Sequence, residues 1–133
     1  MDYSKEIKQN ALTAEYSAKL TQSDACLDEL HAKDRVIERH LDDIYDFRTK
    51  LMAELEYWRS ELVQKNAQED IQIIHEIEGT LNQDIHRTNR ALLDERDVVV
   101  RERNRVLSEK DDIESEYQRA KFALDEEADK FEH

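Results

Sequence analysis

Large apolar residues recur every three or four positions through the first half of the chain, and this spacing constrains the fold more than any other feature. With Leu20 at heptad position a, ten of the fourteen a and d positions between residues 20 and 65 are large and apolar. They are Leu20, Leu27, Leu30, Ile37, Leu41, Ile44, Leu51, Leu55, Trp58 and Leu62. A 3.5-residue period sustained over six to seven heptads predicts a left-handed coiled coil.

The composition agrees with a long helix. The chain has 133 residues, of which 40% are charged, with one glycine and no proline. A globular domain needs turns, and turns depend on residues with special backbone angles. We therefore predict an all-α chain forming one long, nearly continuous helix.

The residues flanking the apolar seam favour two parallel chains. In a parallel pair, position g of one chain faces position e of the next heptad on its partner. Lys33 would then face Glu38 and Glu54 would face Arg59, and both pairs are attractive. We therefore predict a parallel homodimer through this seam, in which the charged a position Asp34 would meet its own copy.

The apolar register stops at residues 64–70 and resumes with Ile71. Across this stretch the helix either continues in a loosened form or turns back on itself. Asn66 could adopt the left-handed conformation that ends a helix, and Gly79 marks a second weak point. We divide the chain into a helical lead-in at 1–19, a strong coiled coil at 20–65, a break at 66–80 and a weaker coiled coil at 81–133.

The second half repeats every seven residues in a more polar form. An apolar a column begins at Ile85, whereas its d column holds Glu95, Glu102, Glu109 and Glu116. Glutamates do not form a dry seam, so the apolar stripe could instead combine positions a and b, and toward the end of the chain it shifts to e. Residues 85–113 are a candidate surface for another protein, with these contact residues: Leu92, Leu93, Arg96, Val99, Val100, Arg103, Val106 and Leu107.

Charge and motif content argue against other classes of function. The net charge of −13 disfavours nucleic acid as a partner, and no apolar run is long enough to insert into a membrane. The five histidines never lie three or four residues apart, so we expect no metal site, and no catalytic or cofactor motif is present. We expect a non-enzymatic protein without cofactors, and the single cysteine, Cys26, favours a cytoplasmic location.

Short strings resemble known filament and scaffold proteins. "ERDVVVRERNRVLSEKD" resembles the ERD-rich repeats in coiled coils of discs-large-type membrane-associated guanylate kinase scaffolds. "DDIYDFRTK" and "EYWRSEL" are similar to strings in intermediate-filament and ciliary filament rods. Together these resemblances imply a eukaryotic cytoskeletal or scaffold rod.

Two functional hypotheses follow from the pattern. The first is a structural rod segment that dimerises and holds the flanking parts of a cytoskeletal or scaffold protein at a fixed spacing. The alternative is an antiparallel helical hairpin or bundle that acts as an adaptor and binds a partner along residues 85–113.

Overall fold

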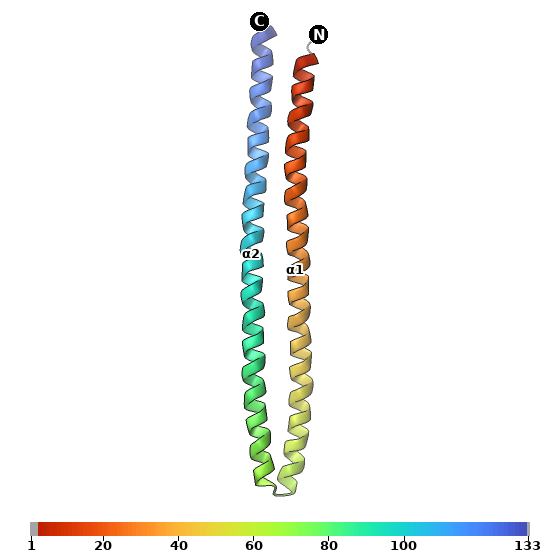
Figure 1. The fold of residues 1–133 in the computed structure, drawn as a ribbon, viewed down its shortest axis with the longest axis vertical. Helices are drawn as coiled ribbons and strands as arrows, with labels where there is room; N and C mark the ends of the chain where they lie inside the picture. The colour runs from red at the N-terminus through yellow and green to blue at the C-terminus, as the bar shows by residue number, and fades with distance from the viewer. Residues whose placement is uncertain (1–2, 133) are drawn as a thin grey trace. The chain divides into compact units, whose positions relative to one another are not determined.

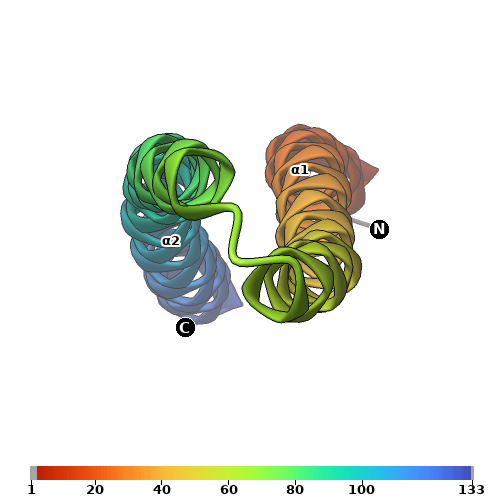
Figure 2. The same cartoon turned by 90° about the horizontal axis from the view of Figure 1, so that it is seen from below.

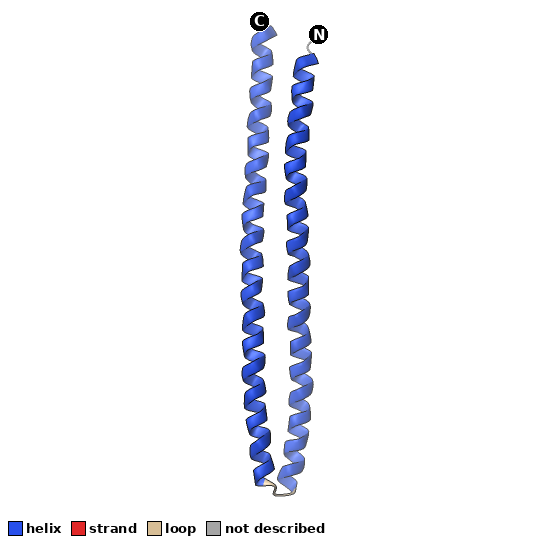
Figure 3. Ribbon diagram, in the orientation of Figure 1, coloured by secondary structure: helices blue, strands red, loops and turns tan. Residues whose placement is uncertain are grey.

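The chain is helical throughout the part that the structure describes, apart from one turn. The computed structural model describes the backbone of residues 3–132 and the side chains of residues 3–127. Helix α1 spans Tyr3–Gln64 and helix α2 spans Gln68–Glu132, and only residues 65–67 of this backbone lie outside them (Figure 3). The predicted all-α class is confirmed. The predicted nearly continuous helix is wrong, because a turn interrupts it within the 64–70 stretch.

Helix α1 ends in a Schellman motif centred on Asn66. The backbone of Asn66 is left-handed, with a φ of 56°. Its amide donates to the carbonyl oxygen of Val63 at 3.2 Å, and the amide of Ala67 donates to that of Leu62 at 3.1 Å. These two bonds satisfy carbonyls that a helix end leaves without partners. The expected left-handed conformation of Asn66 is therefore confirmed, and the chain turns here.

Helix α2 begins at Gln68, directly after its N-cap residue Ala67, and has acidic side chains in its first turn. The carbonyl oxygen of Ala67 accepts the first helical hydrogen bond, from the amide of Ile71 at 3.0 Å, so Ala67 occupies the N-cap position. Its methyl group cannot accept a hydrogen bond from the free amides of the first turn. Glu69 and Asp70 lie in that turn, where negative charge is favourable beside the positive end of the helix dipole.

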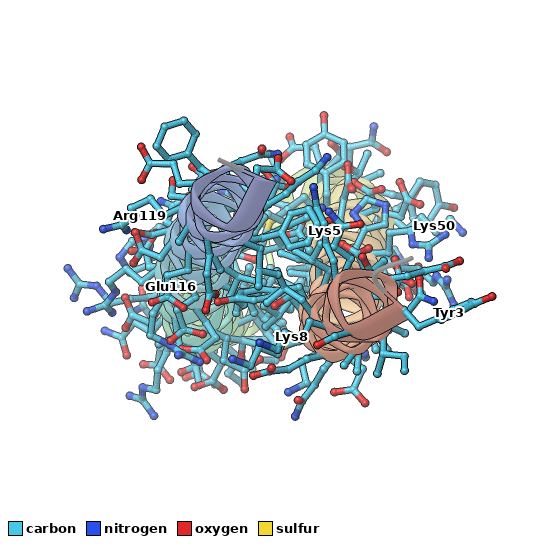
Figure 4. All side chains as sticks on the ribbon, turned by 90° about the horizontal axis from the view of Figure 1, so that it is seen from above. Tyr3, Lys5, Lys8, Lys50, Glu116 and Arg119 are labelled. Atoms are coloured by element: carbon cyan, nitrogen blue, oxygen red, sulfur yellow. The ribbon has the colours of Figure 1, made fainter. Side chains whose placement is uncertain are left out.

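The contacts divide the chain into two compact units, which are described separately. Unit 2 comprises residues 33–98 and contains the turn, with α1 and α2 running antiparallel on either side of it (Figures 1 and 2). Unit 1 comprises residues 1–32 and 99–133, where the start of α1 lies beside the end of α2. Within unit 1, Lys5 lies on the side of α1 toward α2, whereas Tyr3 and Arg119 project away from the neighbouring helix (Figure 4).

Each unit has a thin core made of a single inter-helical seam. In unit 2 the most buried apolar side chains are Ile37 and Ile85, which are 6% and 8% exposed. In unit 1 they are Leu30, Val99 and Val106. Two helices offer only one line of contact, so apolar residues outside that line stay in water unless something else covers them.

Candidate protein-interaction site

The predicted seam residues of α1 line the side of the helix that this same chain covers. Leu30 and Ile37 are buried, and Trp58 is 50% exposed. The remaining seam residues are half-buried: Leu20, Leu27, Leu41, Ile44, Leu51, Leu55 and Leu62. An isolated helix cannot shield a leucine stripe from water, so the burial comes from the antiparallel α2. The spacing thus located the contact face of α1, which α2 occupies in each unit.

The charged a position Asp34 has an opposite charge beside it in unit 2. Its Oδ1 lies 3.3 Å from Nε of Arg96 on α2. The alignment falls short of a hydrogen bond, because the same oxygen is buried without a hydrogen-bond partner. The contact is therefore an ion pair, partly shielded from water on the Asp34 side, whose side chain is 23% exposed.

A second ion pair joins the helices of unit 2 closer to the turn. Arg59 pairs with Glu78 on α2 and with Glu56 on its own helix, the latter at 2.7 Å. The side chains of Arg59 and Glu78 are 29% and 28% exposed. The preceding residue, Trp58, is more exposed than Arg59, at 50%.

Ion pairs also connect the two helical segments of unit 1. Nζ of Lys110 lies 2.9 Å from Oδ1 of Asp24. The hydrogen bond and negative charge of Asp24 raise the pKa of Lys110 above its ordinary value. On α2, Glu102 and Glu109 both pair with Arg105 and raise the pKa of its guanidinium.

Tyr117 provides the aromatic contact of unit 1. Its ring centroid lies 5.3 Å from that of Tyr16, with the ring planes tilted by 53°. Its hydroxyl oxygen lies 3.3 Å from that of Thr13. Further along, Nε2 of Gln9 donates to Oδ1 of Asp125 at 3.2 Å. These contacts join residues 9–16 of α1 to residues 117–125 of α2 in an antiparallel alignment.

The seam of α2 differs from the predicted a and d columns over residues 85–124. Positions a and e face α1: Ile85, Val99 and Val106 are buried at a. Half-buried side chains occupy e, namely Asn89, Arg96, Lys110, Tyr117 and Leu124. Of the d-column glutamates only Glu102 is half-buried, and the others are exposed. Lysine, arginine and tyrosine combine a long apolar stem or ring with a polar tip, so they line a seam that glutamate avoids.

Some residues of the candidate partner surface at 85–113 lie in this seam, and others lie outside it. Val99 and Val106 are buried, while Leu92, Arg96 and Val100 are half-buried. Three members are exposed: Leu93, Arg103 and Leu107, of which Leu93 is 49% and Leu107 42% exposed. The buried members are engaged within the hairpin, so only the exposed ones are available to another molecule.

Exposed apolar side chains concentrate in unit 2, mostly outside the predicted surface. Among the described side chains, fourteen large apolar residues are exposed, and ten of them belong to unit 2. The ten are Val36, Tyr45, Phe47, Tyr57, Trp58, Val63, Ile73, Ile77, Leu93 and Val98. Sequence reasoning missed Ile73 and Ile77, although their i, i+4 spacing beside the Ile71 and Ile74 seam residues was the available signal.

The described residues hold neither a metal-binding cluster nor a segment that could cross a membrane. They contain no group of three or more histidine, cysteine, aspartate or glutamate side chains placed to hold a metal ion. Neither helix, as far as it was described, has a segment apolar enough to cross a membrane.

Comparisons with known proteins give no match for this chain. No protein-family model, no curated protein and no solved structure matches it. The functional interpretation therefore depends on the chain's own geometry.

Proposed function

We propose that this chain is a non-enzymatic helical hairpin that binds another protein through apolar side chains that its own seam leaves exposed. The observation that supports this most strongly is the concentration of exposed apolar residues in unit 2, beside a core whose most buried members are Ile37 and Ile85. Large contiguous apolar surface is costly in water and marks interaction sites. The hairpin is the scaffold that presents it.

The pairing of charges favours the hairpin over the parallel rod. In a parallel homodimer, Asp34 would face Asp34 of the second copy inside the seam, where two like charges repel each other. In the hairpin, Asp34 faces Arg96 instead. A parallel homodimer through the same leucines would also require α2 to leave them. The dimeric spacer, its cytoskeletal or scaffold setting and a cytoplasmic location stay predictions from the sequence.

Selection from an unbiased library of displayed helical peptides tests this function. We expect the full chain to enrich peptides with an apolar stripe, since helix-in-groove binding uses anchors at i, i+3, i+4 and i+7. Binding should be lost when three exposed residues of unit 2 are made polar, as in Phe47→Gln/Ile77→Gln/Leu93→Gln. The matched control in unit 1, Ile7→Gln/Phe122→Gln, should bind normally. If no enriched peptide depends on the residues of unit 2, the proposed function is wrong.

A further inference from the structure

We infer that one face of unit 2, close to the turn, binds a basic amphipathic helix, an inference that rests on the proposed function. We call it the turn-proximal face and define it by four exposed apolar side chains: Phe47, Trp58, Ile73 and Ile77. They are 55%, 50%, 52% and 44% exposed, respectively. All four lie within residues 33–98.

The ion pair between Arg59 and Glu78 places Trp58 and Ile77 on the same side. Arg59 and Glu78 point toward each other across the antiparallel helices. The residue before each of them is rotated by about 100° around its helix. Because the two helices run in opposite directions, these rotations carry Trp58 and Ile77 to the same face of the hairpin, within about one helical turn of each other along it.

Helical spacing extends this pair along both helices. Ile73 precedes Ile77 by four residues, or about one turn, and so lies on the same side of α2. Phe47 precedes Trp58 by eleven residues, about three turns of α1, and returns to the same side. The four side chains therefore form an apolar strip shared by both helices rather than four isolated residues.

Acidic side chains border this strip. Glu54 and Glu61 lie four residues before and three after Trp58, and Asp70 and Asp84 lie seven residues before and after Ile77. These spacings put the four carboxylates on the side of the helix that carries Trp58 or Ile77. No ion pair joins any of them to a basic side chain within the described residues.

The surrounding segment is strongly acidic, in contrast to the remainder of unit 2. Residues 51–84 hold eight acidic and two basic side chains, a net charge of −6. One of the two, Arg59, is already paired with glutamates 56 and 78. Residues 33–50 and 85–98 together hold eight acidic and eight basic side chains. The negative charge of unit 2 is thus concentrated around Trp58, Ile73 and Ile77, and Phe47 lies just outside this acidic segment.

The apolar strip and the carboxylates beside it together indicate the chemistry of the partner. An apolar strip between carboxylates is complementary to a helix with an apolar stripe flanked by lysine or arginine. A second copy of this chain would bring another net charge of −6 against the same face, and phosphate groups of nucleic acid would be repelled in the same way. A basic helix satisfies both the apolar and the electrostatic requirement.

Trp58 is the only tryptophan in the chain, so its fluorescence reports directly on this face. The probe is a synthetic helix of about 18 residues, or five turns, with leucine at i, i+3, i+4 and i+7, lysine beside this stripe, and no aromatic residue. Binding should shift the emission of Trp58 to shorter wavelength as the ring leaves water. It should saturate and weaken with rising salt, because the charges are at the surface. A matched peptide with glutamate in place of lysine should not bind.

Two variants locate the binding. Ile77→Glu should weaken the lysine peptide by about tenfold or more, as expected for a central apolar contact. Phe122→Glu, at an exposed apolar side chain of unit 1, should leave the affinity unchanged. Circular dichroism checks that both variants remain helical. Failure of the lysine peptide to bind, equal binding of the glutamate peptide, or no effect of Ile77→Glu would overturn the inference.

Sedimentation equilibrium tests the competing occupant. We expect no self-association through this face. If the chain self-associates and Ile77→Glu abolishes that self-association, the face binds a second copy and the inference is overturned. The peptide selection separates this failure from failure of the proposed function. If the selected peptides depend on unit 2 but are acidic, the interaction function stands and the basic partner is wrong. If they depend on unit 2 but still bind Ile77→Glu, the interaction function stands and the turn-proximal face is wrong.

Discussion

Asp34 on α1 and Arg96 on α2 form an ion pair inside the seam of unit 2, with Oδ1 and Nε 3.3 Å apart. An aspartate is too short to extend out of a seam position as arginine or lysine does, and the Asp34 side chain is only 23% exposed. Arg96 can approach it because arginine extends from an e position of α2. The pair therefore favours one antiparallel alignment of α1 and α2 in unit 2.

Removing Arg96 alone should destabilise the protein more than removing Asp34 and Arg96 together. We expect Arg96→Leu to lower the free energy of unfolding by about 1–2 kcal/mol, because Asp34 is left partly buried without an opposite charge. The double variant Asp34→Leu/Arg96→Leu should recover most of this loss, since two apolar side chains suit the seam. Urea unfolding followed by circular dichroism measures both. A double variant as unstable as the single one would show that the pair has no coupling.

The left-handed residue at the turn should respond to substitution according to backbone sterics. Asn66→Gly should raise the free energy of unfolding by up to about 1 kcal/mol, because glycine adopts positive φ without steric cost. Asn66→Val should lower it by about 1–2 kcal/mol, because a β-branched side chain clashes in this conformation. Chemical denaturation distinguishes the two. Equal stability of both variants would contradict the Schellman ending of α1.

The single glycine weakens α2 without a packing role. A Cβ added at Gly79 would meet nothing within 4 Å. Gly79→Ala should therefore raise the free energy of unfolding by about 0.5–1 kcal/mol through helix propensity alone. The matched control is the reverse exchange at an exposed position of α1, Ala53→Gly, which should lower it by a similar amount. Loss of stability in Gly79→Ala would indicate a close contact that the fold does not contain.

The contact between Asp24 and Lys110 makes a pH-dependent contribution to unit 1. Asp24 raises the pKa of Lys110 above 10.5, so the folded state holds this proton more tightly than the unfolded state. The stabilisation is complete below pH 10.5 and is lost as pH rises through the folded pKa. Asp24→Asn should therefore be less stable than the wild type at pH 8, and the difference should vanish at strongly alkaline pH.

Urea unfolding at neutral and alkaline pH measures this difference. Asp28→Asn removes a nearby exposed carboxylate that has no ion pair among the described residues, and it should show no comparable pH dependence. A stability difference for Asp24→Asn that persists after Lys110 has lost its proton would assign the effect to something other than the ion pair.

The contact face of α1 could be predicted from the sequence, but its partner could not. Leucine spacing identified the side that contains the buried Leu30 and Ile37. A heptad seam packs equally well against a second copy or against another helix of the same chain, so spacing alone does not distinguish the two. The Asp34 position carried the missing information, because it requires an opposite charge that its own copy lacks.

The seam of α2 was harder to predict because its members are amphipathic. Arg96, Lys110 and Tyr117 count as polar in a hydrophobic pattern, yet their stems and rings line the contact with α1. The turn-proximal face was missed for a related reason. Periodicity identifies helices and their seams, whereas the exposure of Phe47 or Ile77 depends on how many other helices are present to cover them.

The distance between two labels in unit 1 tests the hairpin most directly. Ala14→Cys and Gln118→Cys, in a Cys26→Ser background, place spin labels at exposed sites on α1 and α2, and an excess of unlabelled chain excludes signals between chains. The hairpin predicts a distance below about 30 Å, since packed helices lie roughly 10 Å apart and the label tethers add the rest. A continuous helix would separate the labels by about 156 Å at 1.5 Å per residue, and the absence of a short distance within the chain would contradict the fold described here.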